Sequence, residues 1–390
     1  FCFRTTPSFT DRRVTMELEA DRRWMSLAIS LASRGLGKTW PNPSVGCVIV
    51  SDNKVVGRGV TAPGGRPHAE KVALDQAGFQ AKGATVYVTL EPCSHQGETG
   101  PCVLELIKAK VSEVVIALKD PDPRVSGNGI ETLREKGVKV RSGLLREEAF
   151  WLNQGFFSKI LIKRPLMTLK LASTFDGRIA TESGESEWIT GEKSRQRVHS
   201  IRAQYDAILV GSGTIRKDNP RLTVRGFGIN HKPIRIFIST GVDIPLQSFI
   251  ANSPEDGPVW IIHGPKLSKE KLNQWSSRNI KLIEVPLIDN NLLDLKTMMR
   301  ILGKLGLTRI LCEGGGKVAA TLIKQDLIDR IIGFTGGKIF GSLGFPSIAT
   351  LGLKKLNDMP CLKCINAEKL GNDVLHTWIV ERDNSILKGL

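Results

Sequence analysis

The chain has 390 residues, and at about 150 residues per domain this length predicts two domains. Hydrophobic residues make up 41% of it and charged residues 24%, a globular composition that excludes a disordered or collagen-like protein. No uncharged apolar run reaches 18 residues, so the sequence predicts no membrane-spanning helix. The net charge of +16 indicates an anionic partner, and composition leaves nucleic acid, a lipid surface and phosphorylated small molecules open.

The first half of the sequence alternates helical and strand patterns. After a loose tail at 1–19, we expect a helix at 21–34 with Asp21 as a possible cap, followed by a hairpin. The two strands of this hairpin are expected at 45–50 and 55–60. After them we expect a helix at 68–77, a strand at 84–90, a helix at 103–109, a strand at 114–118, a helix at 130–135, a strand at 138–141 and an aromatic-rich connecting helix at 144–162. Units of this length favour a mostly parallel sheet covered by helices.

A second α/β pattern begins after Lys163-Arg164-Pro165, which predicts a domain boundary at this point. Its predicted strands are at 167–172, 207–210, 234–238, 259–263, 281–285, 309–312 and 375–380, and its two clearest helices are at 192–202 and 317–325. The seven cysteines are odd in number and scattered, which is unlike a secreted disulfide framework and favours a reducing cytoplasm.

One imidazole and two thiols in the first half have the spacing of a metal site. His68 opens a predicted helix, Cys93 follows it by 25 residues, and Cys102 comes nine residues later. Three such ligands suit tetrahedral Zn²⁺ and leave the fourth position open for water, as catalytic zinc requires. Glu70 is close enough to His68 to exchange a proton with that water without being a ligand. This combination of His-x-Glu and Pro-Cys is typical of zinc deaminases; the alternative is a set of unrelated buried cysteines and a core histidine.

With these motifs the first half resembles the cytidine-deaminase-like zinc enzymes, and within them the deaminase half of the bifunctional riboflavin-biosynthesis family. The resembling segments are Pro41–Gly46, His68–Glu70, Glu91–His95, Pro101–Cys102 and Asp120–Val125. The resemblance implies that Asn42 contacts the pyrimidine and that His95 lies near a substrate phosphate. The loop before Cys102 departs from the family pattern, with Glu98 and Gly100 where Arg and Pro are usual.

A glycine turn follows the predicted strand at 309–312 and precedes a helix. Glycines at this position let a phosphate approach backbone N–H groups at a helix N-terminus. Gly314, Gly316 and Ala319 satisfy the dinucleotide-binding pattern G-x-G-x-x-A. The strand that follows does not end in the acidic residue that such a site has, so an ordinary glycine turn is an equally good interpretation of this segment.

Other segments of the second half resemble the reductase half of the same family, which has a dihydrofolate-reductase-like fold and uses NADPH. These segments are 169–180, 184–190, 211–214 and 218–225. The resemblance implies cofactor contacts from Ala172, Trp188, Thr214, Asp218, Thr240, Gly315, Gly316, Lys317, Val318, Ala319, Ala320 and Thr321. It implies substrate contacts from Lys170, Ser186, Arg202, Leu222, Arg225 and Glu313, with Lys170 and Asp218 near the reacting sugar carbon. The arginines suit bidentate phosphate recognition.

The fold class that follows is α/β, with a cytidine-deaminase-like α/β/α domain at 20–163 and a dihydrofolate-reductase-like domain at 164–390. The expected enzyme contains one zinc ion per deaminase domain, uses NADPH, acts on phosphorylated pyrimidines, binds neither nucleic acid nor membrane, and forms a homo-oligomer. A tRNA or nucleotide deaminase and a non-enzymatic scaffold are the alternatives. Cys361 and Cys364 form a CxxC without a second pair, so we interpret them as ordinary thiols.

Overall fold

The computed structural model describes residues 9–96, 100–122, 126–226, 228, 230–288 and 291–381, and side chains from residue 18 onward. The chain forms two compact units, of which the first ends at Leu161 and the second begins at Ile162. The sequence placed this division after Lys163. In the described part of the chain, no helix is long and apolar enough to cross a membrane.

A five-stranded sheet in the order β2-β1-β3-β4-β5 forms the centre of the first unit. Its strands are β1 (Gly46–Ser51), β2 (Lys54–Val60), β3 (Thr85–Val88), β4 (Glu113–Ile116) and β5 (Lys139–Ser142). β3, β4 and β5 are parallel, whereas β1 is antiparallel to both of its neighbours, so only part of the sheet has the predicted parallel arrangement. Residues 46–50 of β1 are buried, which requires cover on both faces of the sheet.

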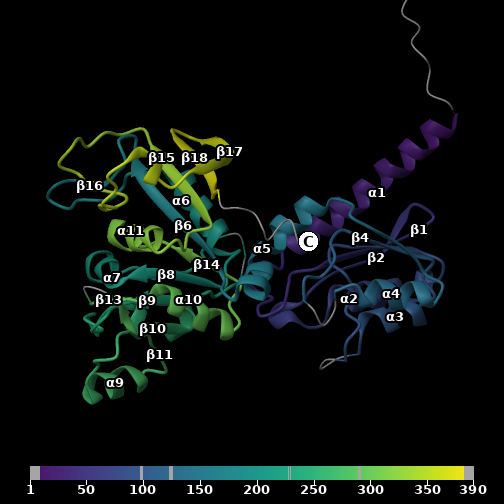
Figure 1. Ribbon diagram of the computed structural model, residues 1–390, viewed down its shortest axis with the longest axis horizontal. Helices are drawn as coiled ribbons and strands as arrows, with labels where there is room; N and C mark the ends of the chain where they lie inside the picture. The colour runs from purple at the N-terminus through teal and green to yellow at the C-terminus, as the bar shows by residue number, and fades with distance from the viewer. Residues whose placement is uncertain are drawn as a thin grey trace, which may run out of the picture. The chain divides into compact units, whose positions relative to one another are not determined.

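Helices provide this cover. Figure 1 shows α2 (Ala69–Ala77), α3 (Cys102–Lys108) and α4 (Asn128–Glu135) gathered on one side of the sheet and α1 (Phe9–Ser33) on the other. The unit ends with α5 (Arg146–Ile162), the predicted connecting helix. The first unit is therefore the predicted α/β/α sandwich.

The start of α1 corrects the expectation of a loose tail, because residues 9–19 are helical. No proline or glycine interrupts the sequence from 9 to 33, so the helix can extend backwards from the part that packs on the sheet. Asp21, predicted to cap the helix, lies inside it. Its carboxylate accepts a hydrogen bond from the Tyr87 hydroxyl (2.6 Å) and pairs with Arg141, which joins α1 to β3 and β5.

α1 contacts the sheet most closely at Gly46, the first residue of β1. A Cβ at this position would lie 1.9 Å from the carbonyl oxygen of Ala28 in α1. We expect Gly46→Ala to force the helix backbone away and to destabilise this packing by about 1–3 kcal/mol. Native-state hydrogen exchange of the α1 and β1 amides measures the loss.

Gly100→Ala is the control for Gly46→Ala, because a Cβ at Gly100 has nothing within 4 Å and its backbone is not in the left-handed region. Equal loss of protection in the two variants would contradict the close contact between α1 and β1.

The second unit contains a nine-stranded sheet in the order β11-β10-β9-β8-β14-β6-β15-β18-β17. The strands of this sheet are β6 (Leu166–Thr174), β8 (Ala207–Gly211), β9 (Ile234–Ile238), β10 (Val259–His263), β11 (Lys281–Glu284), β14 (Arg309–Cys312), β15 (Arg330–Gly336), β17 (Leu362–Leu370) and β18 (Asp373–Val380). Neighbours from β11 to β15 are all parallel, and β18 is antiparallel to both β15 and β17. Figure 1 shows β15, β18 and β17 side by side at one end of the sheet.

Helices and short strands complete the second unit. Its helices are α6 (Glu192–Arg202), α7 (Ser212–Asp218), α8 (Phe249–Asn252), α9 (Lys269–Ser276), α10 (Leu295–Lys304) and α11 (Gly316–Lys324). Its short strands are β7 (Arg178–Ala180), β12 (Leu287–Ile288), β13 (Leu292–Leu293) and β16 (Phe345–Pro346). Part of the core lies between β8, β9, β10 and the helices that cover them, where Trp275 of α9 packs edge-on against Phe237 at a ring-centroid distance of 6.2 Å.

Candidate active sites of the two units

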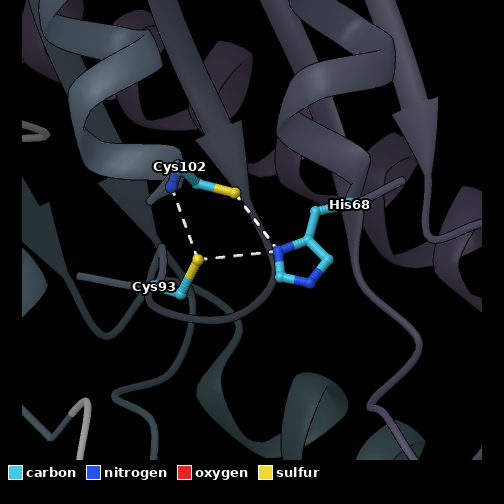
Figure 2. Close-up of side chains that lie close together, drawn as sticks. All are labelled: His68, Cys93 and Cys102. Carbon is cyan, nitrogen blue, oxygen red and sulfur yellow. Dashed lines mark hydrogen bonds between the residues drawn. The ribbon is translucent and has the colours of Figure 1, made fainter. Parts of the chain in front are cut away.

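His68, Cys93 and Cys102 converge on one point in the first unit, as Figure 2 shows. The Nδ1 atom of His68 lies 3.3 Å from the sulfur of Cys102 and 3.6 Å from the sulfur of Cys93. One ligand atom from each residue lies within 4.8 Å of the others, and the described residues contain no other such group of three. The structure thus brings together the three residues that the sequence predicted as metal ligands.

Three different elements supply these side chains. His68 is the residue before the first turn of α2, Cys93 lies in the loop after β3, and Cys102 is the first residue of α3. The backbone N–H of Cys102 donates to the sulfur of Cys93 (3.4 Å), and the N–H of Val103 donates to the carbonyl of Cys93 (3.3 Å). The two cysteines are therefore held together by the start of α3.

The arrangement fits a zinc ion. Tetrahedral zinc with its usual bond lengths keeps sulfur and nitrogen ligands roughly 3.6 Å apart, and the two distances from His68 are within a few tenths of an ångström of that value. The hydrogen bond with Cys102 lowers the pKa of the Cys93 thiol to about 4, so an anionic sulfur is available for a cation. Three ligands leave one of the four positions open, as in catalytic rather than structural zinc sites.

Glu70 lies beside this cluster in the first turn of α2 and is only 3% exposed. Burial and the nearby Cys93 raise the pKa of its carboxyl to about 7, although His68 opposes the shift. A carboxyl group with a pKa near neutrality can both accept and return a proton. The geometry therefore suits the predicted proton-transfer role.

Asn42 lies next to the turn that leads into His68. Its side-chain Nδ2 donates to the carbonyl of Gly65 (3.1 Å), and a Cβ at Gly65 would collide with this side chain. The segment that carries Asn42 is also fixed by α5, because the Asn153 amide bonds both the N–H (3.0 Å) and the carbonyl (2.9 Å) of Ser44. Asn42 is therefore held in place beside the turn that leads into His68.

His95 follows Cys93 by two residues, and its Nδ1 atom is buried without a hydrogen-bond partner among the described residues. A buried polar atom without a partner is costly in a folded protein, unless a ligand or water satisfies it. Glu98 lies outside the described residues, and Gly100 is exposed.

The predicted residues of the second unit meet at one edge of its sheet. β6, β14, β8 and β9 are adjacent and parallel, so the segments at their carboxyl ends reach the same edge. These segments carry Lys170 and Ala172 in β6, Thr214 after β8, Thr240 after β9, and residues Glu313 to Thr321 after β14. Ligands of open α/β sheets bind at this edge.

Lys170, Arg202 and Glu313 form a charged cluster at this edge. The Arg202 guanidinium donates from Nε to Glu313 Oε1 (2.6 Å) and from the adjacent amino group to Oε2 (3.0 Å), and Lys170 Nζ lies 3.9 Å from Oε2. Burial alone would raise the pKa of Glu313, but Arg202 and Lys170 hold it below its usual value. Burial lowers the pKa of Lys170. Arg202, which the resemblance assigned to the substrate, is thus paired with Glu313 in this structure.

The glycines near α11 serve packing as well as ligand access. A Cβ at Gly211 or Gly314 would contact Val318 at 2.7 or 2.9 Å, so both glycines let α11 lie close to the strand ends. Gly315 and Gly316 begin the helix, and a Cβ at Gly316 would lie 2.6 Å from the carbonyl of Pro346. The first N–H groups of a helix favour a phosphate.

The remaining predicted residues lie in loops and at helix ends around this edge. Trp188 lies in the same loop as Ser186 and is 59% exposed. The guanidinium carbon of Arg195 lies over its ring, 4.6 Å from the ring centroid of Trp188. Asp218 is the last residue of α7. The Leu222 side chain is buried in the core, so any contact with substrate would have to come from its backbone.

His199 is a residue of this region that the sequence analysis missed. Its Nδ1 atom lies 3.1 Å from the carbonyl oxygen of Thr223 and 3.2 Å from the backbone nitrogen of Arg225. Burial lowers its pKa, and Arg202 and Arg225 lower it further. His199 precedes Arg202 by three residues on α6, and this same-face spacing is the signal that could have identified it.

Cys361 and Cys364 are both exposed, and neither belongs to a metal-binding group among the described residues. Cys364 lies in β17, the edge strand that the sequence analysis did not predict. The interpretation as ordinary thiols remains a prediction.

Comparison with known proteins covers both units. Residues 18–118 match the zinc-binding region of cytidine and deoxycytidylate deaminases, and residues 165–376 match the RibD C-terminal domain. Riboflavin biosynthesis protein RibD of Aquifex aeolicus is 40% identical over 92% of this chain and 98% of its own length. The chain belongs to the RibD family. The Escherichia coli member is 39% identical over 91% of the chain and 98% of its own length.

Solved RibD structures have the same fold. A RibD structure from Acinetobacter baumannii superposes with a TM-score of 0.84 at 35% identity, covering 94% of this chain and all of the other. A deaminase/reductase from Thermotoga maritima superposes with a TM-score of 0.82 at 34% identity, with the same coverage. The predicted fold classes, cytidine-deaminase-like and dihydrofolate-reductase-like, are confirmed, and the chain is a bifunctional deaminase and reductase of riboflavin biosynthesis.

Proposed function

We propose that residues 20–163 hydrolyse an exocyclic amine from 2,5-diamino-6-ribosylamino-4(3H)-pyrimidinone 5′-phosphate. Residues 164–390 then reduce the ribosyl group of the deaminated product to ribityl with NADPH, giving 5-amino-6-(5-phosphoribitylamino)uracil. The observation that carries this proposal is the convergence of His68, Cys93 and Cys102 beside the buried carboxyl group of Glu70. The basic charge of +16 suits phosphorylated substrates and cofactor, with no need for nucleic acid or membrane.

In the deaminase unit, His68, Cys93 and Cys102 would hold one zinc ion, which lowers the pKa of a coordinated water towards about 7. Glu70 takes up the two protons of the attacking water in turn, and passes one to a ring nitrogen and the other to the amine, which leaves as ammonia. Asn42 orients the pyrimidine, and His95 contacts the substrate phosphate. The unpartnered Nδ1 atom of His95 supports that last assignment.

In the reductase unit, NADPH supplies the hydride when it is bound. Gly315, Gly316 and the first turn of α11 accept its phosphates, with further contacts from the residues named above at the strand ends. Lys170 and Asp218 lie near the sugar carbon, and Lys170 holds a proton at Nζ. Ser186, Leu222, Arg225 and the Arg202–Glu313 pair position the substrate. The location of the cluster at the carboxyl edge of the sheet supports these assignments.

Removing the metal should separate the two reactions. After chelation we expect ammonia release to fall to background, because three protein ligands without zinc cannot activate water. NADPH oxidation with the deaminated substrate should stay near the untreated rate, and added Zn²⁺ should restore ammonia release. The measurements are a metal analysis and the two assays on the same sample.

The same experiment tests the alternatives. A nucleotide or tRNA deaminase predicts ammonia release without NADPH consumption. A scaffold predicts neither stoichiometric zinc nor ammonia. We also propose a cytoplasmic location, from the scattered odd cysteines, and a homo-oligomeric assembly.

A further inference from the structure

We propose that Glu91 is a positioning residue for the zinc site of the first unit. It precedes Pro92 and Cys93, and its carboxylate binds the main chain where α4 begins. Through these bonds it fixes the segment that presents the Cys93 sulfur. The proposal rests on the deaminase function stated above and adds a residue to it.

The carboxylate of Glu91 accepts four backbone hydrogen bonds. Its Oε2 atom accepts from the N–H groups of Asp120 (3.2 Å) and Gly127 (3.0 Å). Its Oε1 atom accepts from those of Gly129 (3.0 Å) and Ile130 (3.3 Å). The side chain is 4% exposed, so water does not compete for these donors. Charge-assisted bonds of this kind are stronger than bonds between neutral groups.

Glu91 acts as the cap of α4 from outside the helix. The first N–H groups of a helix lack partners within it, and a nearby side-chain oxygen usually accepts from them. In α4 the cap residue is Gly127, which has no side chain to do so. The carboxylate of Glu91 bonds the N–H groups of Gly129 and Ile130 instead, and its negative charge suits this end of the helix dipole.

The start of α4 also lies directly against Pro92. A Cβ at Gly129 would lie 2.3 Å from the carbonyl oxygen of Pro92, so only glycine allows this approach. The backbone N–H of Glu91 also donates to the carbonyl of Leu118 (2.9 Å). The positions of both Glu91 and Pro92 are thus fixed by neighbouring elements, and Cys93 is the next residue along the chain.

Loss of the Glu91 hydrogen bonds should weaken metal binding more than it affects overall folding. Partners that orient metal ligands typically change metal affinity by about 10- to 100-fold when they are mutated. Glu91→Gln keeps the size of the side chain but replaces one acceptor oxygen with an NH₂ group that faces backbone donors. We expect the Cys93 segment to loosen and zinc to dissociate faster.

Asp21→Asn is the matched control. It makes the same change of carboxylate to amide at another buried site of the first unit, where Asp21 joins α1 to Tyr87 and Arg141. Within the described residues, the hydrogen bonds and ion pairs shown for Asp21 go to Tyr87 and Arg141, neither of which lies in the loop that carries Cys93. A role of Glu91 in stability alone would make the two variants behave alike.

The experiment measures zinc release from the full-length, zinc-loaded protein to a chromogenic chelator, with hydrogen exchange of the same samples. We expect release at least about 10-fold faster for Glu91→Gln and within about 2-fold of wild type for Asp21→Asn. Exchange should increase at the start of α4 and around Cys93 in the first variant only. Equal release rates in both variants, or an unchanged rate in Glu91→Gln, would overturn the proposal.

A second variant covers the case in which Glu91→Gln does not fold. Gly129→Ala places a methyl group against the Pro92 carbonyl and beside the Glu91 carboxylate, and so displaces the same segment from the side of α4. It should also release zinc faster, and an unchanged rate would count against the proposal. If the wild-type protein holds zinc but releases no ammonia, the proposed function fails while the zinc-release comparison still decides the role of Glu91.

Discussion

Replacing Glu70 with alanine should reduce ammonia release by about 10²- to 10⁴-fold, the usual contribution of general acid–base catalysis. Glu70 is buried beside Cys93 and His68, and burial raises the pKa of its carboxyl to about 7. The three-ligand cluster of the described residues contains no carboxyl group, so Glu70 is free to act on a proton and not as a ligand. The loss should appear in kcat, because the proton moves during the reaction and not during binding.

The reductase activity of the same variant is the internal control. Glu70 lies in the first unit, so NADPH oxidation with supplied deaminated intermediate should remain near the wild-type rate. Glu70→Gln tests whether lost volume matters, since it retains the side-chain size and should lose as much activity as Glu70→Ala. Glu135→Ala, an exposed carboxylate at the end of α4, should change neither activity. If both activities fell together in a well-folded Glu70 variant, the independent-site interpretation would be wrong.

The sequence predicted the regular elements wherever the local pattern was strong. The strands at 234–238, 259–263 and 309–312 and the helix at 192–202 have the same bounds as β9, β10, β14 and α6. These three strands are short, mostly apolar segments buried in a parallel sheet. β17 was missed because it is an edge strand with mostly exposed side chains, which leave no alternating pattern to detect.

The three-residue cluster could be predicted because ligand chemistry limits the residue types and their spacing. His68, Cys93 and Cys102 are recognisable before their positions in space are known. The role proposed for Glu91 could not be predicted, since it depends on backbone N–H groups, which every residue except proline has.

Contacts between residues of the second unit that are distant in sequence could not be predicted either. Arg202 and Glu313 were both assigned to the substrate, but their sequence separation of 111 residues gives no sign that they pair with each other. Only the fold places α6 over the carboxyl end of β14. The pair therefore carries a structural role as well as the proposed substrate contact, and the two roles can be separated by mutation.

Breaking the Arg202–Glu313 pair should strongly destabilise the second unit. The two side chains are 13% and 8% exposed, so removing one partner leaves a buried charge without its strongest counter-charge. Such single substitutions typically cost about 3–5 kcal/mol. We expect Arg202→Met and Glu313→Leu each to lose stability in this range, measured by hydrogen exchange of the β14 and α6 amides.

The pH dependence of this loss follows from the pKa of Glu313. Arg202 and Lys170 hold that pKa below its unfolded value of about 4.3 despite burial. The contribution of the carboxylate is therefore fully present above about pH 5 and declines as the pH falls through the lower, folded-state pKa. The stability difference between wild type and Glu313→Leu should stay constant near neutrality and shrink only in acid.

The double variant Arg202→Met/Glu313→Leu separates stability from function. Replacing a whole buried ion pair with apolar side chains is often neutral or stabilising, because the desolvation of both charges is avoided. We expect the double variant to recover most of the stability that each single variant loses, while NADPH oxidation stays low because Lys170 has lost the carboxylate beside it. Deaminase activity in the same samples controls for general damage. If reductase activity returned together with stability, the pair would serve the fold alone, and its proposed place in the substrate site would be wrong.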